Sequence, residues 1–543
     1  MQDSGEVQAL VERAEALRAR GLLDDAAVVL TSAITLDPRA YDARLTLAQV
    51  LRAQGRYSTA VEQLSRLTTD HPERSEPWWL LAKICWDSGD RASAAIAAQS
   101  YAARRPKDAA AQIRAAELLM DLGQFEKAAP LLDRARDIEP ANAKLSYLRG
   151  RLLFEDGKSE FAIEAYENAV RAAPRLGEAA GGRVLEAWLA NFRSWLQNST
   201  GEYHCLAPRE RLQWRAPSVI PETEANAWDV GPVEVPEIFI GKLENAEVFG
   251  REFPVLAADG CLFVEGFVTS PAVYPHKGRT VKYASTDGRV LLDLPAVPLK
   301  ADGPCILLGR SNNYFHFLLE SLPRIWSAEQ IGAPGDARAL VPHGLVATQL
   351  ELLQMLGFPD SRLIALPEDG SIHCRTLYAP SLLGGTFAIS GKAIEFLRDR
   401  VLRRFPRMPD LPRRVYLSRN RMPRRHIKNE AELLAVLEGH GFSVVYPESL
   451  RLDEQVRMFA QAEAILSPDS SALSNLTFAN ARTKVGVFSW RGLHKPLWHC
   501  IAMQVGAHLT YLHADSIIES SPMIAHRDMR IDPSLLNQWL AAL

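Results

Sequence analysis

Five glycines recur every 34 residues in the first third of the chain, and this repeat constrains the fold more than any other feature. They are Gly21, Gly55, Gly89, Gly123 and Gly157. Prolines and small residues keep the same spacing: Pro38, Pro72, Pro106, Pro140 and Pro174; Ala26, Ala60, Ala94, Ala128 and Ala162; Ala14, Ala48, Ala82, Ala116 and Gly150. Small residues let two helices approach closely, glycine serves the turn between them, and proline ends the second helix. The period therefore predicts stacked helical pairs.

The repeat units, such as "AAAQIRAAELLMDLGQFEKAAPLLDRARDIEPAN", resemble the tetratricopeptide repeat family over about residues 7–176. The resemblance implies a superhelix whose concave face binds peptides or proteins. Recruiting a partner or acceptor, and serving as an intramolecular spacer or self-association surface, both remain open. The stretch "GEAAGGRVLEAWLANFRSWL" keeps a helical period and is expected to be a capping helix, so that a solenoid spans residues 1–196. Trp78 and Trp79 are expected to pack between repeats.

Composition limits the classes of partner and compartment. The 543 residues suggest two or three domains, and 62 Lys and Arg against 65 Asp and Glu argue against nucleic acid as a partner. Neither a signal peptide nor a transmembrane segment is expected, which favours a cytoplasmic protein, with peripheral association at the inner membrane left open. The six cysteines lack metal-binding spacing and are expected to be reduced, buried thiols.

A second domain of the α/β class is expected after a linker. Residues 197–235 lose the helical period and gather Pro, Thr, Asn and Gly, so they are predicted to link the solenoid to a domain at 236–543. Between 413 and 490, strands and helices alternate as βαβαβαβ, within a nucleotide-binding half of about 410–515. Asn429 with Glu432 is expected to form a capping box, and Gly441 a helix end. Such a sheet binds ligands at the carboxyl ends of its strands.

Most of 236–520 resembles the family 61 glycosyltransferases. The segments that carry the resemblance are "LENAEVFG", "NNYFHFLLESLPRIW" at 312–326, and the stretch from "RRVYLSRNRMPRRHIK" to "AILSPDSSALSNLTFANARTKVGVF" at 413–488. The resemblance implies a GT-B arrangement of two Rossmann-like halves. It also implies inverting transfer of a sugar from a nucleotide diphosphate, with the nucleotide sugar as substrate, no other cofactor and no obligatory metal.

An arginine-rich loop, "RNRMPRRHIK", follows the first strand of the alternating region. The departing diphosphate gains negative charge as the glycosidic bond breaks, so cations must already be aimed at it. Arginine suits this task because its planar fork grips two oxygens and stays charged. Arg419, Arg424 and Arg425 are therefore predicted diphosphate ligands, with Lys428 a weaker candidate. A solvated basic loop is the alternative.

The segment "SPDSSALSN" at 467–475 follows the third strand and leads into a helix expected from about Ser474. The amino end of a helix offers N–H groups to a phosphate, so Asp469, Ser470, Ser471 and Asn475 are predicted to line the donor site. The resembled family reads close to Gly-Pro-His-Gly-Ala-Gly-Leu-Thr-Asn here, so a histidine and two inner glycines are missing. Asp469 is expected to turn toward the arginines or to cap the helix. The site is interpreted as altered but usable.

An inverting transfer also needs a base for the acceptor hydroxyl. On a helix beginning near Asn313, His316 and Glu320 stand four residues apart and share a face, with Arg324 four further on. His316 and Glu320 are the predicted catalytic pair, matching a Tyr-x-His-x-x-x-Glu motif of the resembled family, although a packed core histidine is the alternative. Asn313 and Arg324 are candidates for sugar or acceptor contact, and capping is an equal alternative for Asn313.

The four histidines near the end of the chain, His494, His499, His508 and His513, are expected to pack or to lie at the surface. Their spacing changes across a helix and a strand, so no metal site is predicted. Two functions therefore remain: a transferase acting on a protein or surface-glycan acceptor that the repeats recruit, or a noncatalytic scaffold with a degenerate transferase domain.

Overall fold

The computed structural model describes most of the chain. The described residues are 2–174, 183–199, 201–213, 215–222, 233–250, 253–263, 280–295, 297–309, 311–385, 388–490, 496–517, 520 and 526–543. Contacts divide the chain into two compact units, Met1–Ala180 and Gly181–Leu543.

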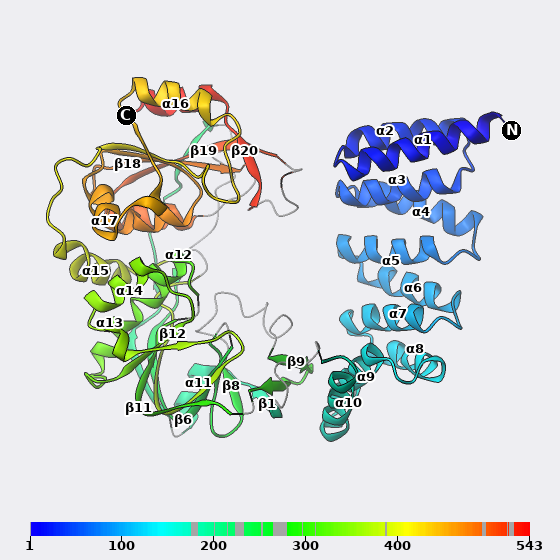
Figure 1. Ribbon diagram of the computed structural model, residues 1–543, viewed down its shortest axis with the longest axis horizontal. Helices are drawn as coiled ribbons and strands as arrows, with labels where there is room; N and C mark the ends of the chain where they lie inside the picture. Colours follow the sequence, from blue (N-terminus) through cyan, green and yellow to red (C-terminus); the bar gives the residue numbers. More distant parts are fainter. Residues whose placement is uncertain are drawn as a thin grey trace. The chain divides into compact units, whose positions relative to one another are not determined.

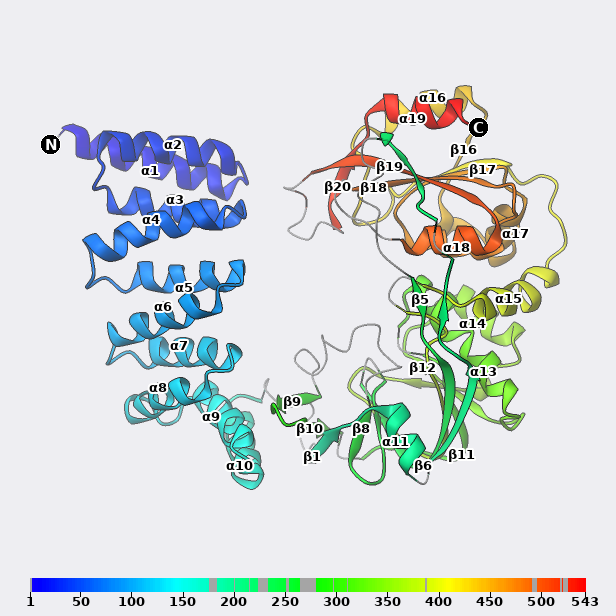
Figure 2. The same ribbon diagram turned by 180° about the vertical axis from the view of Figure 1, so that it is seen from behind.

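The first unit is a stack of helical hairpins (Figures 1 and 2). Its described helices are α1 (Gln2–Ala19), α2 (Leu23–Leu36), α3 (Tyr41–Ala53), α4 (Tyr57–Asp70), α5 (Glu76–Ser88), α6 (Arg91–Ala103), α7 (Ala109–Asp121), α8 (Phe125–Ile138), α9 (Ala143–Glu155) and α10 (Ser159–Ala172). Each odd-numbered helix packs against the next even-numbered one, and each pair contacts the pair that follows. The helical pairs predicted from the 34-residue period are confirmed.

The repeated residues have the roles that their chemistry suggests. The five glycines have φ between 73° and 84°, and an added Cβ at each would meet nothing within 4 Å. Glycine is therefore required by the left-handed turn and not by lack of space. The alanines at the repeated positions, from Ala14 to Ala162, are fully buried where the helices cross. Trp78 and Trp79 pack against the core of the middle repeats, and Trp79 stacks on Tyr101 with ring centroids 5.0 Å apart.

Residues 177–182 of the expected capping helix at 177–196 lie outside the described residues, and the described part from 183 does not form a single helix. Arg183–Leu189 is instead strand β1, which pairs with β10 (Arg289–Leu294) and β8 (Cys261–Phe263) of the second unit. Within its described residues, the segment is helical only toward its end, as α11 (Phe192–Asn198). The sequence "RVLEAWL" fits either period over so short a stretch, and pairing with distant strands decides between them.

Strands also occupy part of the predicted linker at 197–235. They are β2 (Glu202–Ala207), β3 (Glu210–Arg211), β4 (Ser218–Ile220) and β5 (Glu234–Val235). Strand β2 joins the first sheet beside β6 (Ile238–Phe249), whereas β4 joins the second sheet beside β19 (His508–Ile517). Much of the described part of this segment therefore belongs to the second unit.

The first sheet is mixed. Among the described residues it has eleven strands, in the order β13-β12-β11-β14-β6-β7-β8-β1-β10-β9 with β2 beside β6. The strands not yet given bounds are β7 (Val255–Leu256), β9 (Val281–Ala284), β11 (Leu299–Leu307), β12 (Arg338–Pro342), β13 (Leu363–Leu366) and β14 (Ser371–Pro380). Strands β13, β12, β11 and β14 are parallel and stand third, second, first and fourth in chain order. That order, found in doubly wound folds, reverses between β11 and β14.

The second sheet has a longer parallel part. Its order is β16-β15-β17-β18-β19-β20, with β4 beside β19. The bounds are β15 (Arg414–Leu417), β16 (Ser443–Val445), β17 (Ala464–Pro468), β18 (Lys484–Trp490) and β20 (Asp528–Arg530). The first five strands are parallel and stand second, first, third, fourth and fifth in chain order, so this order reverses between β15 and β17. The βαβ alternation predicted for 413–490 is confirmed.

The described residues of the second unit also form further helical segments. They are α12 (Tyr314–His316), a π-helix η4 (Phe317–Ser321), α13 (Arg324–Gln330), α14 (Ala347–Met355), η5 (Asp360–Arg362), α15 (Gly391–Arg400), η6 (Leu402–Arg404), α16 (Glu430–Gly439), η7 (Pro447–Ser449), α17 (Leu452–Gln461), a 3₁₀ helix η8 (Ser471–Phe478), α18 (Leu497–Val505) and α19 (Pro533–Ala541). One hydrophobic cluster includes Val341 of the first sheet, Val485 of the second and Leu473 of η8. The two sheets therefore share a core, and α12 lies between them in Figure 1.

The expected capping box at the start of α16 is also absent. Asn429 Oδ1 accepts from the Ile531 N–H at 3.0 Å, and its Nδ2 donates to the Ile531 carbonyl and to Glu432. Asn429 thereby ties α16 to the chain's last segment. Gly441 has φ of 75°, as expected for a residue just after a helix.

We expect Gly241→Ala to lower the free energy of unfolding of the second unit by about 1–3 kcal/mol, the usual cost of overpacking. A Cβ at Gly241 in β6 would lie 2.6 Å from Leu196 Cδ1 and 2.7 Å from Phe192 Cζ of α11. Calorimetric unfolding of the full chain measures the change. The matched control is Gly303→Ala, where a Cβ meets nothing within 4 Å. Equal stability of the two variants would contradict the packing of α11 on β6.

Candidate functional site

Three loops meet where both sheets reverse their strand order. One leaves β11 and enters α12, the second follows β15, and the third joins β17 to η8. Ligands of doubly wound sheets bind outside the carboxyl ends of strands at such reversals. All the sequence-predicted site residues lie on these loops or on the helical segments that follow β11 and β17.

Two arginines approach the third loop from the second. Arg425 Nη1 donates to the carbonyl of Asp469 at 3.0 Å, and Arg425 adopts a left-handed φ of 64°. Arg419 is half-buried, and its Nε lacks a hydrogen-bond partner among the described residues. Burial lowers the pKa of Arg419 and the charge of Arg425 lowers it further, while the charges of Asp469 and Glu448 act in the opposite direction. Two partly desolvated cations therefore converge here without a full set of acceptors.

The other basic residues of this loop have partners elsewhere. Arg424 is exposed, and its Nη1 lies 3.1 Å from His526 Nδ1. Lys428 pairs with Asp528 at 2.7 Å, and the guanidinium of Arg421 stacks over Tyr446, 3.7 Å from the ring centroid. Of the three predicted arginines, Arg419 and Arg425 therefore face the candidate site, whereas Arg424 contacts His526 in the segment before β20.

The loop at 467–475 exposes fewer of its side chains to the candidate site than the prediction implies. Asp469 is buried, and its Oδ1 accepts from Trp498 Nε1 at 2.7 Å. The arginine that reaches it, Arg425, contacts its backbone carbonyl. The helix begins at Ser471, three residues before the expected start, and Ser470 is a buried N-cap without a side-chain cap bond. Ser471 is the predicted serine that keeps some exposure.

Asn475 joins the two sheets. It is fully buried, and its Oδ1 accepts from the hydroxyl of Tyr314 at 2.8 Å. Burial raises the pKa of Tyr314, so the phenol remains protonated and able to donate. Asn475 Nδ2 has no hydrogen-bond partner in the described part of the chain. Asn475 is therefore placed to hold α12 against η8, and a ligand could reach it only if this packing opened.

His316 and Glu320 form the pair that their spacing predicts. His316 Nδ1 lies 2.9 Å from Glu320 Oε2, and the side chain of His316 is 32% exposed against 6% for Glu320. The helix is not regular, because Phe317–Ser321 is a π-helix, an irregularity that is frequent at functional sites. Asn313 caps the helix, accepting from the Phe315 N–H at 3.0 Å, and its Oδ1 is 3.5 Å from Ser471 Oγ.

Arg324 lies on α13 with an exposed fraction of 1%. Its Nη1 donates to the carbonyl of Leu308, which follows β11, at 3.4 Å. This placement holds the chain at the carboxyl end of β11 and keeps Arg324 from touching a sugar in this conformation.

A buried carboxylate fixes the start of the arginine loop. Glu430 accepts from the hydroxyl of Tyr416 at 2.6 Å, from that of Ser418 at 2.8 Å and from the side-chain amide of Asn420. Burial raises the pKa of Tyr416, and the charge of Glu430 raises it further. These bonds flank Arg419 on both sides in the sequence, so Glu430 limits where its backbone can lie.

The residues considered for metal binding do not gather. No group of three His, Cys, Asp or Glu side chains able to hold a metal ion occurs in the described ranges. His499 is buried, with Nε2 2.7 Å from the Arg215 carbonyl, and His494 lies outside the described residues. Four of the six cysteines are buried, but Cys205 is exposed and Cys261 intermediate, and all six are free thiols. No helix among the described segments combines the length and apolarity that crossing a bilayer requires.

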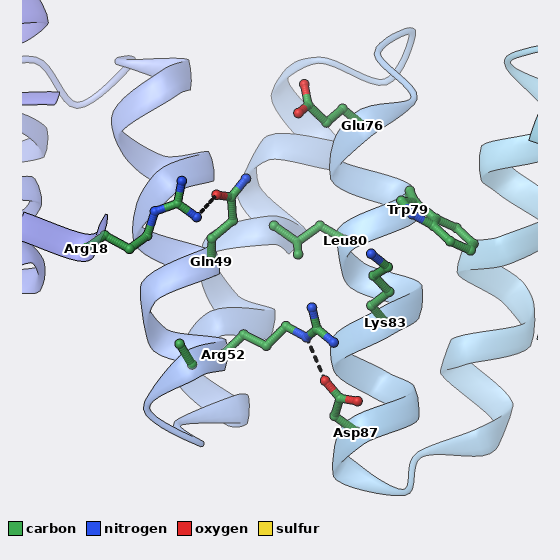
Figure 3. Close-up of a pocket in the computed structure, with 9 residues that line it drawn as sticks. Arg18, Gln49, Arg52, Glu76, Trp79, Leu80, Lys83 and Asp87 are labelled. Atoms are coloured by element: carbon green, nitrogen blue, oxygen red, sulfur yellow. Dashed lines mark hydrogen bonds and ion pairs between the residues drawn. The ribbon is translucent and has the colours of Figure 1, made fainter. Parts of the chain in front are cut away.

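The first unit has a groove of about 520 Å³ on the first helices of its first three hairpins (Figure 3). Arg18 donates to Gln49 at 2.8 Å, and Arg52 pairs with Asp87 at 2.6 Å. Trp79 and Leu80 also line the groove. The groove thus offers an aromatic surface with polar groups of both signs.

Sequence reasoning missed Trp498, Tyr314 and Glu430. Trp498 lies on α18, far along the chain from the loop that it orients. Tyr314 directly follows Asn313, which caps the helix after β11, and this position was a signal that could have found it. Glu430 stands in the first turn of α16, where an acidic residue is common for helix stability alone.

Each family model that matches the chain falls within one of the two units. Residues 314–486 match the family model described as Glycosyltransferase 61, and residues 17–84 and 113–176 match two models described as Tetratricopeptide repeat. Except for Asn313, the predicted site residues fall inside the first match. No curated protein matches the chain.

Three solved structures that are similar to the chain each align with about a third of it. A crystal structure of MamA is 17% identical over 31% of this chain and 92% of its own, with a TM-score of 0.28. A MamA fragment from Desulfovibrio magneticus RS-1 is 15% identical over 31% and 96%, with a TM-score of 0.28. YrrB, titled a TPR protein with an unusual peptide-binding site, is 18% identical over 30% and 85%, with a TM-score of 0.27. Likeness at this level says nothing of what this chain binds.

We expect Glu430→Ala to lower the free energy of unfolding by about 2 kcal/mol or more, because the buried hydroxyls of Tyr416 and Ser418 lose their acceptor. Trypsin should also cleave the arginine loop faster, since its first residues are no longer held. Chemical denaturation and timed proteolysis measure the two effects. Glu438→Ala, at an exposed position on the same helix, is the matched control and should stay within about 0.5 kcal/mol of the parent. A Glu430→Ala protein as resistant as this control would refute the role.

Proposed function

Because the chain combines tetratricopeptide repeats with a family 61 glycosyltransferase domain, we propose that it transfers a sugar from a nucleotide-sugar donor to a protein or surface-glycan acceptor. The transfer inverts the anomeric centre. The second unit takes a GT-B-like arrangement, a proposal supported by two sheets with doubly wound strand orders on one shared core.

The observation that carries this proposal is the state of Arg419. Its guanidinium is partly desolvated, lies next to a second cation and keeps an Nε without a partner among the described residues. The charges of Asp469 and Glu448 offset part of the free-energy cost of holding these two cations together, and a bound anion would offset more of it. The diphosphate of a nucleotide sugar is such an anion, and its charge rises as the sugar leaves. Arg419 thus stabilises the departing group.

The remaining donor residues divide into contacts and supports. Arg425 and Ser471 join Arg419 at the diphosphate, with Arg424 at the exposed flank. Asp469, Ser470 and Asn475 shape the loop from within, since all three are buried. This division explains how a loop without glycines serves a donor: it offers Ser471 and the amino end of η8 without needing a close backbone approach.

His316 is the proposed base. The Glu320 carboxylate accepts from Nδ1–H, which leaves Nε2 as the nitrogen that takes up a proton. In the transfer, the acceptor hydroxyl loses its proton to His316 while its oxygen bonds to the anomeric carbon. The bond from that carbon to the donor phosphate breaks, and the nucleotide diphosphate leaves with the electron pair. Asn313 and Arg324 position the surrounding segment.

The repeats serve this reaction by recruiting the acceptor. The groove of the first unit has the size and the aromatic, mixed-charge lining that suit an extended peptide or glycan. The transfer needs no further cofactor and no obligatory metal, and we propose that it takes place in the cytoplasm or at the inner membrane surface.

A noncatalytic scaffold is the alternative, and one observation favours it. Asp469, Ser470 and Asn475 are committed to internal packing, so the loop at 467–475 presents few groups to a donor. In a scaffold, the second unit would bind no nucleotide sugar while the repeats still bound a partner.

We expect one of a panel of UDP, GDP, CMP and ADP sugars to raise the Tm of the full chain. At a hundredfold excess over Kd, the bound donor should raise the free energy of unfolding by about 2.7 kcal/mol. Arg419→Ala should weaken that response about tenfold or more, because a charge-assisted contact is lost. Arg375→Ala, on an exposed position of β14, is the matched control and should respond as the parent does. No response to any donor would favour the scaffold.

With the donor so identified, His316→Ala should lower turnover by about a hundredfold or more while leaving donor affinity unchanged, as expected for loss of a general base. Glu320→Gln should also lower turnover, because the amide no longer fixes the histidine tautomer. Steady-state transfer or donor hydrolysis gives the rate. His440→Ala, at the exposed end of α16, is the control. Full activity in both variants would remove His316 from the role of base.

A further inference from the structure

A second arginine-lined pocket lies on the opposite rim of the second sheet. It has a volume of about 540 Å³ and is lined from α15, η6, α17, the segment before β15 and the end of η8. Arg413 and Gln461 place it at the amino ends of β15 and β17, whereas the candidate transfer site lies at their carboxyl ends. It is therefore separate from the site described above.

The charge of this pocket is one-sided. Arg398, Arg407, Arg413 and Arg457 line it, and no Asp or Glu does. Arg413 pairs with Glu463 at 3.0 Å. For Arg398, Arg407 and Arg457, no carboxylate of the described residues lies within ion-pairing distance. Three cations thus share one concavity without a protein counter-ion.

Arg457 shows the cost of this arrangement. Its Nε is buried and has no hydrogen-bond partner within the described ranges. Burial lowers the pKa of Arg457, and the charge of Arg407 lowers it further. A guanidinium stays charged despite such a shift, so the repulsion and desolvation persist in the folded protein. An anion would offset both.

The pocket walls are fixed in advance. Arg398 Nη1 donates to the carbonyls of Thr477 at 2.7 Å and Ala479 at 2.8 Å, which anchors its guanidinium. Gln461 bonds both backbone groups of Met408, at 2.9 Å and 2.7 Å, and so holds the segment that carries Arg407. Ordering the Arg398 side chain on binding therefore costs little entropy.

We propose that this pocket binds a small phosphorylated anion through Arg398, Arg407 and Arg457. Guanidinium groups match phosphate oxygens in pairs, and a volume of about 540 Å³ is that of a small-molecule site. A nucleic acid is disfavoured, because the chain as a whole carries a net charge of −3. Free polyphosphate and the phosphates of a nucleotide share this chemistry, and the test separates them.

The test uses the full chain with Arg419→Ala, which removes a contact of the transfer site. Inorganic pyrophosphate should raise its Tm in a saturable way without added metal. Adding Arg457→Ala should weaken that response about tenfold or more, as loss of one charge-assisted contact predicts. The control is Arg404→Ala in the same background, which removes an exposed arginine outside the pocket lining and should leave the response unchanged. A tighter response to UDP than to pyrophosphate identifies a nucleotide as the source.

Three results would overturn the proposal. One is an equal Tm rise with sodium chloride at matched ionic strength, and another is a pyrophosphate response unchanged by Arg457→Ala. The third is complete loss of the response in Arg419→Ala alone, which would assign all pyrophosphate binding to the transfer site. If Arg457→Ala does not fold, Arg407→Ala carries the test, because Arg407 is exposed and its removal leaves no cavity. Failure of the donor panel leaves this test intact, since pyrophosphate is its own probe.

Discussion

The hydrogen bond from the Tyr314 hydroxyl to Asn475 holds the candidate site together. It joins the segment that follows β11 of one sheet to the helix that follows β17 of the other. Trp498 reinforces it, since the indole donates to Asp469 while its ring meets Phe315 edge-on at 5.6 Å. The Trp498–Asp469 bond is buried and the Tyr314–Asn475 bond is partly buried, and an unpaired polar group is expensive there, so both favour one relative placement of these loops. Every functional inference about the second unit depends on that placement.

The strand order of the second sheet explains why these cations lie at the junction. Arg419 leaves β15 and meets the loop after β17 because the strand order reverses between those two strands. Glu430, although anionic, does not neutralise the loop, since its oxygens are occupied by Tyr416, Ser418 and Asn420. It acts as a positioning group. The loop can therefore be both rigid at its base and positively charged toward the site.

The sequence predicted features that depend on local chemistry. The glycine turns of the repeats follow from φ alone, and the βαβ alternation follows from short apolar runs between helices. His316 and Glu320 contact each other as predicted although the segment between them is a π-helix, because a four-residue separation still brings their side chains together. These features need no knowledge of distant contacts.

The remaining features required long-range pairing. Residues 183–189 form a strand because β8 and β10 lie beside them, and nothing within that stretch specifies those partners. In the same way, Asp469 looked like a residue facing phosphate until Trp498, 29 positions away, provided its donor. Asn475 and Ser470 lie on the loop and helix that were expected to line the donor site, but both are buried. Side-chain direction in an eight-residue 3₁₀ helix is fixed by what packs on it.

That short helix also relates the two arginine clusters. Helix η8 begins at Ser471 beside the transfer site and ends at Phe478, which lines the second pocket. At about 2.0 Å per residue it spans about 16 Å, roughly twice the distance over which salt at physiological strength screens exposed charge. Direct electrostatic influence between exposed charges at the two ends is therefore weak. An anion in the pocket would therefore act on the transfer site mainly by shifting η8. Arg398 contacts the end of this helix, because it donates to the carbonyls of Thr477 and Ala479.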